Sequence, residues 1–163
     1  MIIVSDTTPI ISLLKINRLD LLEKLFGEVL IPDAVYEELT TDKRFIDEAK
    51  RITKASYIKS VSVLDSEAVQ ILKMETGLDQ GESEAIVLTN ELKADILLMD
   101  EVKGRTVSKQ MGITIMGTIG LLISAYEDDL LTSDDVRECI DNLQRSGRHI
   151  GKRHYQILLD RLR

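Results

Sequence analysis

The chain has 163 residues, of which 44% are hydrophobic and 30% are charged, and this is the size and composition of one domain that buries its own core. Its net charge of −7 argues against a protein that coats nucleic acid non-specifically, because such binding depends on many Lys and Arg contacts with phosphates. The single cysteine, Cys139, excludes an internal disulfide and a cysteine-rich zinc site. No signal-like segment opens the chain, and no apolar run approaches the roughly 20 residues of a membrane helix, so a cytoplasmic protein without membrane contact is expected.

Short apolar strands and helices alternate along the first half of the chain. In order, the pattern predicts a strand at 2–4, helices from 9 and from 17, a strand at 29–31, helices at 32–39 and 43–54, and a strand or extended connection at 57–64. Thr8 and Pro9 suit the start of the first helix, and Asn17 is predicted to open the second, which Gly27 ends.

The second half continues this alternation. It is predicted to contain a helix at 66–74 capped by Ser66, a helix at 79–93, a strand at 96–99, a helix at 102–111, a strand at 113–116, and helices from 117, 133 and 152. Such alternation predicts an open parallel sheet with right-handed crossovers. Residues 1–130 are expected to form the main part of the domain, and 131–163 a helical extension that is basic at its end. Ligands of such sheets bind beyond the carboxyl ends of the strands.

Two aspartates directly follow predicted strands. Asp6 comes after the strand at 2–4 and Asp100 after the strand at 96–99, so parallel pairing carries both to the same edge of the sheet. Asp is also a common turn and capping residue at strand ends, which explains each residue taken alone. Their occurrence as a pair favours an acidic site at this edge.

Further acids lie on predicted helices. At about 100° per residue, Glu38 falls on the same arc as Leu39 and is directed toward the edge of the core, although a Glu at the border of that arc can also reach water. In the run 79–84 three acids crowd the first turns of a helix. Asp79 and Glu82 match a capping box there, so helix capping explains these acids as well as a functional site does.

A cluster of carboxylates at this edge predicts a cation site. Ionised carboxylates repel one another and are costly to bury, so a cluster that remains charged is expected to bind cations. Oxygen-only ligands favour Mg²⁺ or Mn²⁺ over zinc. These ions activate water and stabilise charge during displacement at a phosphodiester. The acids therefore indicate a metal-dependent nuclease.

Several segments of the chain together resemble the PIN-domain family, in particular the small prokaryotic group that includes VapC-like toxins and the domain of unknown function 3368. The resemblance lies within residues 1–130 and rests on segments 4–9, 31–39, 81–86 and 98–105. It implies a three-layer α/β/α fold with a central parallel sheet of about four to five short strands. It also implies hydrolysis of RNA phosphodiester bonds with Mg²⁺ or Mn²⁺, in some relatives as the toxin of a type II toxin–antitoxin pair.

The same resemblance assigns roles to individual residues. The acidic quartet of the family, which serves catalysis and metal binding, falls on Asp6, Glu38, Glu82 and Asp100. Supporting roles fall on the hydroxyl of Thr7 or Thr8, on Glu84 and on Arg105. Most active relatives have Asp where this chain has Glu82, and the nearby Glu84 is the alternative third acid.

The C-terminal tail is the most basic part of the chain. Residues 145–163 hold six cationic residues against Asp160 alone, a local charge of +5 that leaves −12 for residues 1–144. Because an acidic body needs local attraction for a polyanion, Arg148, Lys152 and Arg153 are predicted to contact RNA. A solvated helix whose arginines pair with acids of the body is the ordinary alternative. An antitoxin-like partner is a third use of this surface.

The predicted function is that of a metal-dependent ribonuclease. The alternative is a non-catalytic PIN-like module that binds nucleic acid or protein. A homodimer is also predicted, because one helix carries more apolar surface than a peripheral helix requires. Its apolar residues are Ile119, Leu122, Ile123 and Tyr126.

Overall fold

Five short strands form a parallel sheet in the computed structural model, which describes residues 1–162. They are β1 (Ile3–Ser5), β2 (Val29–Pro32), β3 (Ile58–Val61), β4 (Ile96–Leu98) and β5 (Ile115–Met116). Their order is β3-β2-β1-β4-β5, and every neighbouring pair is parallel. The chain therefore moves outward from β1 to β3 and returns on the other side with β4 and β5. The order reverses between β1 and β4, where Ser5 pairs with Leu98 and where open α/β sheets form a binding crevice.

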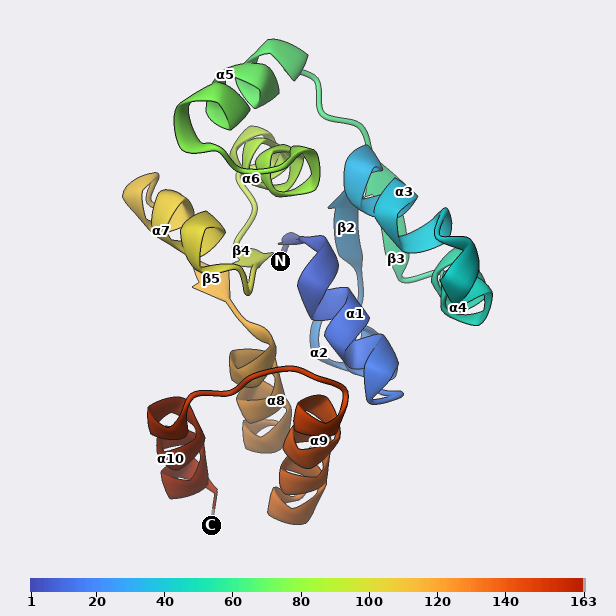
Figure 1. Cartoon of the computed structure of the whole chain (residues 1–163), viewed down its shortest axis with the longest axis vertical. Helices are drawn as coiled ribbons and strands as arrows, with labels where there is room; N and C mark the ends of the chain where they lie inside the picture. Colours follow the sequence, from blue (N-terminus) through green and yellow to red (C-terminus); the bar gives the residue numbers. More distant parts are fainter. Residues whose placement is uncertain (163) are drawn as a thin grey trace.

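Helices cover both faces of the sheet (Figure 1). They are α1 (Thr7–Lys15), α2 (Asp20–Phe26), α3 (Asp33–Thr40), α4 (Ile46–Lys54), α5 (Ser66–Thr76), α6 (Gln80–Leu92), α7 (Val102–Gln110), α8 (Thr118–Glu127), α9 (Ser133–Arg145) and α10 (Lys152–Arg161), with a 3-10 turn η1 (Lys43–Phe45) before α4. The predicted three-layer α/β/α architecture is confirmed. Arg163, counted above in the basic tail, lies outside the described residues.

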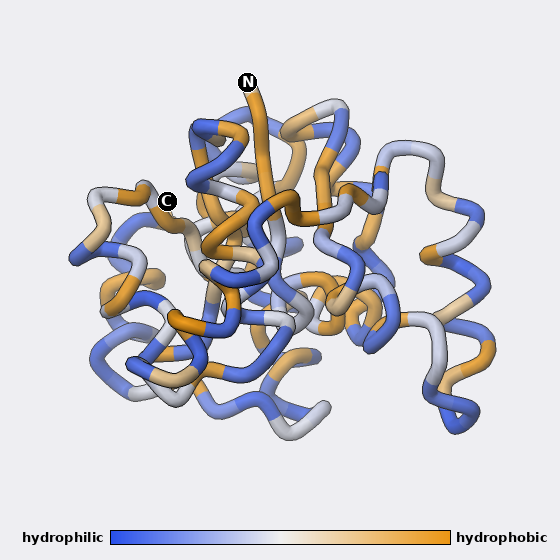
Figure 2. Tube along the Cα trace, turned by 90° about the horizontal axis from the view of Figure 1, so that it is seen from above, coloured by the Kyte–Doolittle hydropathy of each residue, from blue (hydrophilic) through white to orange (hydrophobic). Residues whose placement is uncertain are grey.

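Alternate strand residues face two separate hydrophobic cores. Ile3 and Leu98 belong to the core formed with α1, α2, α8, α9 and α10. Val4 and Leu97 belong to the core formed with α5, α6 and α7. Figure 2 shows hydrophobic stretches running through the middle of the molecule and hydrophilic ones on many outer turns. Each fully buried aliphatic side chain contributes about 1.5–3 kcal/mol, so both cores hold the strand ends firmly in place.

Glycine ends two of the helices as the sequence predicted. Gly27 and Gly77 end α2 and α5 with positive φ values of 77° and 73°, which glycine adopts without strain. Three predicted helix starts are wrong by a few residues. Helix α1 begins at Thr7 with Asp6 as its N-cap, and not at Pro9 after Thr8. Asn17 does not open a helix but adopts a left-handed conformation with φ of 57°, and α2 begins at Asp20. Asp65, not Ser66, caps α5, because its carboxylate accepts the Ala68 N–H.

The apolar face of α8 is covered within the same chain. Leu122 is 0% exposed and Ile123 is 8% exposed, while Ile119 and Tyr126 are half-buried against the same core. Helices α9 and α10 pack on α8 and supply much of this cover. These residues therefore do not form the free surface from which the homodimer was inferred. Within residues 1–162, no helix combines the length and the apolar composition needed to cross a membrane.

Candidate active site

Asp6 lies at the point where the strand order reverses. It follows β1 directly and is the N-cap of α1, with extended backbone angles of φ −77° and ψ 173°. Its backbone N–H donates to the Leu98 carbonyl of β4 at 2.9 Å, which fixes the residue between the two central strands. Asp6 is only 3% exposed. The sheet thus holds a carboxyl group inside the crevice, where few water molecules reach it.

The surroundings of Asp6 oppose its ionisation. Burial is the main cause that raises its pKa, from 3.8 to about 7, and the Thr7 backbone N–H offsets part of this effect. Glu82, Asp79 and Glu38 raise the pKa further by charge repulsion. Because desolvation and like charges both disfavour the anion, this group is only partly ionised at neutral pH unless a cation lies beside it.

Glu38 approaches the same place from α3. A methyl group at position 81 would lie 2.5 Å from Glu38 Oε1, so Gly81 lets this carboxylate rest against the first turn of α6. Glu38 is exposed as a residue, but partial burial of its carboxyl group raises its pKa, the neighbouring Thr7 hydroxyl lowers it and Asp79 raises it. Among the described residues the buried Thr7 hydroxyl has no partner at hydrogen-bond geometry, while Thr8 is exposed. The Thr7 hydroxyl thus lies close enough to Glu38 to act on its carboxylate, although the two are not at ideal hydrogen-bond geometry.

Glu82 lies in the first turn of α6 and takes part in the predicted capping box. Its Oε2 accepts the Asp79 N–H at 3.1 Å, and Asp79 Oδ1 accepts the Glu82 N–H at 2.8 Å. Burial raises the pKa of Glu82, and repulsion from Asp79, Glu101 and Glu38 raises it further. Capping and membership of the acidic cluster therefore coexist in one side chain.

Glu84 is directed to a different place. Its Oε1 accepts the Ala34 N–H at 3.2 Å, in the first turn of α3, and its Oε2 accepts the Gln80 side-chain amide. A carboxylate at this position satisfies a free N–H at a helix start and interacts favourably with the helix dipole. Glu84 thus joins α6 to α3, and Glu82 is the acid that shares the surroundings of Asp6.

Asp100 lies on the other side of the crevice, and its charge is already balanced. Its two oxygens accept the Thr118 N–H at 2.8 Å and the Thr118 hydroxyl at 2.5 Å, at the start of α8. Arg148 Nη2 lies 3.0 Å from Asp100 Oδ1, and the two side chains are 24% and 8% exposed. A methyl group at Gly117 would lie 2.8 Å from the same oxygen, so a side chain at this position would force the carboxylate to shift. Asp100 is therefore held by a helix start and an arginine.

Arg148 belongs to the segment 146–151, which joins α9 to α10 and crosses the C-terminal helices in Figure 1. Besides Asp100, its guanidinium contacts Ser12 of α1, to which Nη1 donates. Arg105, predicted as a supporting residue, donates from Nη1 to the Met99 carbonyl at 3.0 Å. The structure thus places Arg148 inside the domain, whereas its sequence context favoured an exposed contact with RNA.

A groove of about 660 Å³ starts at Asp100 and Arg105 and runs between α8 and α10. Isoleucines of both helices form much of its wall. Its basic lining residues are Arg105, Arg148, His149, His154 and Arg161. Lys152 and Arg153 are exposed in the first turn of α10 and lie outside this lining. The basic tail therefore has two surfaces, one that lines the groove and one that faces solvent.

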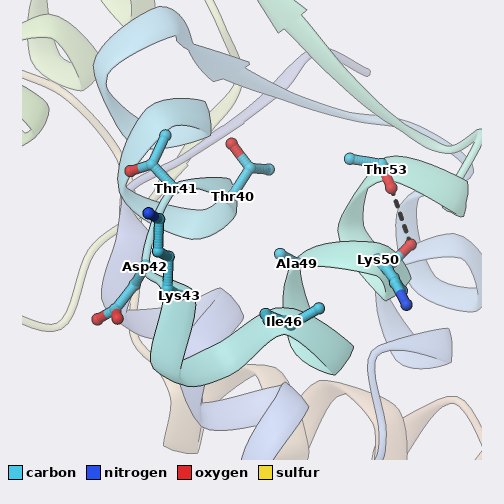
Figure 3. Close-up of a pocket in the computed structure, with 8 residues that line it drawn as sticks. All are labelled: Thr40, Thr41, Asp42, Lys43, Ile46, Ala49, Lys50 and Thr53. Atoms are coloured by element: carbon cyan, nitrogen blue, oxygen red, sulfur yellow. Dashed lines mark hydrogen bonds between the residues drawn. The ribbon is translucent and has the colours of Figure 1, made fainter.

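A smaller pocket of about 290 Å³ lies between the end of α3 and α4 (Figure 3). Threonines and lysines line much of it, and the Thr53 hydroxyl donates to the Lys50 carbonyl at 3.0 Å. None of the predicted acids lines this pocket. It is separate from the crevice at β1 and β4.

The donors at the crevice fit a divalent cation in their chemistry. Asp6, Glu38 and Glu82 offer only oxygen ligands, and their mutual repulsion would be relieved by a positive ion. Asp100 is turned toward Thr118 and Arg148. Across residues 1–162, no three acidic, histidine or cysteine side chains are placed so that they could hold one ion together. Binding by this set therefore requires side-chain movement.

Part of the site could not be located from the sequence pattern. The sequence pattern did not identify Thr118 and Arg148 as the partners of Asp100. It also did not indicate that Glu101 repels Glu82. Thr118 carried a usable signal, because it follows β5 just as Asp6 and Asp100 follow β1 and β4. Polar residues after a third strand belong to the same edge of a parallel sheet.

Comparison with known proteins places the whole chain in one family. The model of family DUF3368, described as a PIN domain, matches residues 2–163. The match includes α9 and α10, which the resemblance noted from the sequence did not cover. No curated protein matches the chain. PIN domains are generally nucleases and typically use divalent metal ions. The fold, the acids at the reversal of strand order and this match lead to one conclusion: the chain belongs to the PIN-domain family.

Proposed function

We propose that this protein is a metal-dependent ribonuclease that hydrolyses RNA phosphodiester bonds, with Mg²⁺ or Mn²⁺ held by Asp6, Glu38 and Glu82. The observation that carries the proposal is the state of Asp6. Burial and three neighbouring acids raise its pKa to about 7 inside the crevice. Keeping such a group buried is costly, and a bound cation offsets the cost by favouring the anion.

When bound, a divalent ion supplies an activated water and stabilises charge at the phosphodiester. The residues of the chain have separate tasks around it. Glu38 and Glu82 bring carboxylates from α3 and α6 to the end of β1. Asp6, fixed at the end of β1 by its backbone hydrogen bond to the Leu98 carbonyl, supplies the third carboxylate. The Thr7 hydroxyl, which lies beside Glu38, is the neutral donor nearest these acids and would donate to a phosphate oxygen of the substrate.

Basic residues near the groove provide the attraction for RNA. Lys152 and Arg153 are exposed and form the first turn of α10, beside the lining of the groove. In the proposal they bind phosphates, and Arg148 reaches the RNA only after it leaves Asp100. Replacing Lys152 and Arg153 with Ala weakens RNA binding and lowers the salt slope by about 1 for each phosphate that is no longer neutralised.

The proposal also extends to partners. The biological role is that of the toxin in a type II toxin–antitoxin pair, in which an antitoxin protein covers the acidic crevice. We also propose that the protein forms a homodimer. The apolar face of α8 does not support this proposal, because other helices of the chain bury it. Light scattering at tens of micromolar tests the dimer, and a mass of one chain contradicts it.

Cleavage of end-labelled single-stranded RNA of mixed sequence tests the catalytic function. We expect cleavage in Mn²⁺ or Mg²⁺, no cleavage in chelator, and loss of cleavage in Asp6→Asn and Glu38→Gln. Glu37→Gln is the matched control, because Glu37 adjoins Glu38 on α3 but is not among the charges that shift the pKa of Asp6. Cleavage that persists in Asp6→Asn or in chelator contradicts the proposal.

One observation favours a second candidate, a PIN-fold module that binds RNA or protein without cleaving it. Asp100 is engaged by Arg148 and Thr118, which leaves the quartet incomplete in this arrangement. Binding of RNA with the same affinity in chelator and in Mn²⁺, with no cleavage product, identifies this alternative.

A further inference from the structure

Arg148 is the strongest feature of the crevice that the proposed chemistry does not use. Its guanidinium joins three distant parts of the chain, since it contacts Asp100 after β4 and Ser12 on α1 from the segment before α10. The Asp100 side chain is 8% exposed and Ser12 is 3% exposed, so the interaction lies within the protein. Arginine pairs with carboxylates through directed N–H bonds and stays charged at every working pH.

The ion pair uses most of the binding capacity of Asp100. A carboxylate has about four acceptor positions. Three of these are occupied, two by the backbone and hydroxyl of Thr118 and one by Arg148. A divalent cation that binds Asp100 must therefore displace Arg148, or bind despite electrostatic repulsion from the nearby guanidinium.

Arg148 is also the main inward attachment of its part of the tail. Between Gln144 and His149, Arg148 alone is partly buried and the remaining residues are exposed. Its backbone N–H donates to the Leu143 carbonyl at 3.0 Å, and Gly147 precedes it with a φ of 96°. The guanidinium joins this stretch to β4 and α1. Ser146 and Gly147 are hydrogen-bonded only to the end of α9, and Ile150 is the next residue that packs on the core.

The geometry points to Arg148 as a built-in counter-ion that competes with a divalent cation for Asp100. In the arrangement seen here the tail neutralises Asp100 and leaves Asp6, Glu38 and Glu82 as the available acids. Release of Arg148 adds Asp100 to the ligands. The inference rests on the proposed function in one respect only, namely that these acids bind a divalent cation. Because coupling is reciprocal, cation binding must loosen the segment 146–151 by the same factor by which its release tightens cation binding.

Titration calorimetry with Mn²⁺ on chelator-treated protein tests the competition. Arg148→Ala is expected to bind Mn²⁺ roughly tenfold more tightly than wild type, within the usual range of coupling between sites. Arg161→Ala is the matched control, since it removes the same charge from the same tail. Its partner Glu127 is 3.8 Å away, and both side chains are more than half exposed. Equal or weaker Mn²⁺ binding in Arg148→Ala overturns the inference.

A second measurement uses the wild-type chain and does not depend on the folding of any variant. Trypsin cleaves after Arg145 and Arg148, and Mn²⁺ is expected to accelerate cleavage there relative to cleavage after Lys43 and Arg44 in the exposed η1 turn. Unchanged or slower relative cleavage contradicts the competition. If wild type binds Mn²⁺ and cleaves RNA while Arg148→Ala binds Mn²⁺ no more tightly, the inference alone fails. If the competition is observed but RNA is not cleaved, the proposed function alone fails.

Discussion

The carboxyl ends of β1 and β4 are neighbours in the sheet, yet they hold their aspartates in opposite electrostatic states. Asp6 is surrounded by other acids, and its pKa is raised to about 7. Asp100 is paired with Arg148 and hydrogen-bonded by Thr118. The topology gives the two residues equivalent positions, but the surrounding elements place acids beside Asp6 and an arginine beside Asp100. Position at the end of a strand identifies an aspartate as a candidate metal ligand. Only the residues around that aspartate show whether its carboxylate is available to bind a cation.

The largest expected effect comes from Asp6 and concerns how stability depends on pH. Between about pH 4 and 7 folded Asp6 retains its proton, whereas the unfolded chain, with a pKa of 3.8, has lost it. Ionisation therefore opposes folding, and stability falls as pH rises through this window. The raised pKa values of Glu38 and Glu82 act in the same direction.

Asp6→Asn removes the main contribution to this effect. In chelator at pH 8 the variant should exceed wild type in free energy of unfolding by up to about 4 kcal/mol, and near pH 4 the two should converge. Denaturant unfolding at several pH values measures the difference. Parallel pH profiles for the two proteins would show that Asp6 is not held as described.

Substitution at the Asp100 side of the crevice is expected to lower stability, whereas Asp6→Asn raises it. Arg148→Ala leaves Asp100 largely buried without its counter-ion, so the free energy of unfolding in chelator should fall by about 3 kcal/mol. Adding Asp100→Asn should recover part of the loss, because the uncompensated charge is then gone. Arg161→Ala, at an exposed pair, should cost less than about 1 kcal/mol. Urea unfolding measures these free energies. Equal losses of stability in Arg148→Ala and Arg161→Ala would show that the Arg148–Asp100 pair is no more important than the exposed pair.

The smallest expected effect separates two acids on one helix. Glu84→Gln weakens a hydrogen bond to the Ala34 N–H and should lower the free energy of unfolding by about 1 kcal/mol, with Mn²⁺ affinity unchanged. Glu82→Gln should lower Mn²⁺ affinity because it removes a charge beside Asp6. Calorimetry on both variants compares their Mn²⁺ affinities. A larger loss of affinity in Glu84→Gln than in Glu82→Gln would make Glu84 the third acid of the site.

The parts of the site that follow from short-range sequence rules were predictable. Asp6 and Asp100 follow apolar strands, and Asp79 with Glu82 forms a capping box that depends on four consecutive residues. Glu38 was placed by helical periodicity. The crevice itself also followed, because parallel strands bring their carboxyl ends to one edge.

What the sequence could not supply was the packing of the C-terminal helices. Arg148 and Asp100 are 48 residues apart, and their pairing depends on how α9 and α10 fold back over α8. A run of positive charge usually marks a solvated face, so the inward arginine could not be distinguished from its exposed neighbours. The same packing covers the apolar face of α8, which periodicity alone left open to a partner.

The capping box of α6 has a consequence for following the site in solution. The carboxylate of Glu82 accepts the Asp79 N–H, so any ligand that draws this carboxylate away leaves one peptide group exposed to exchange. The box of α9 is built with Asp135, and a shorter acid therefore suffices to start a helix in this chain. If a cation draws the Glu82 carboxylate away from α6, the Asp79 amide should change its resonance and its rate of hydrogen exchange, so this amide reports occupancy of the site without any substrate.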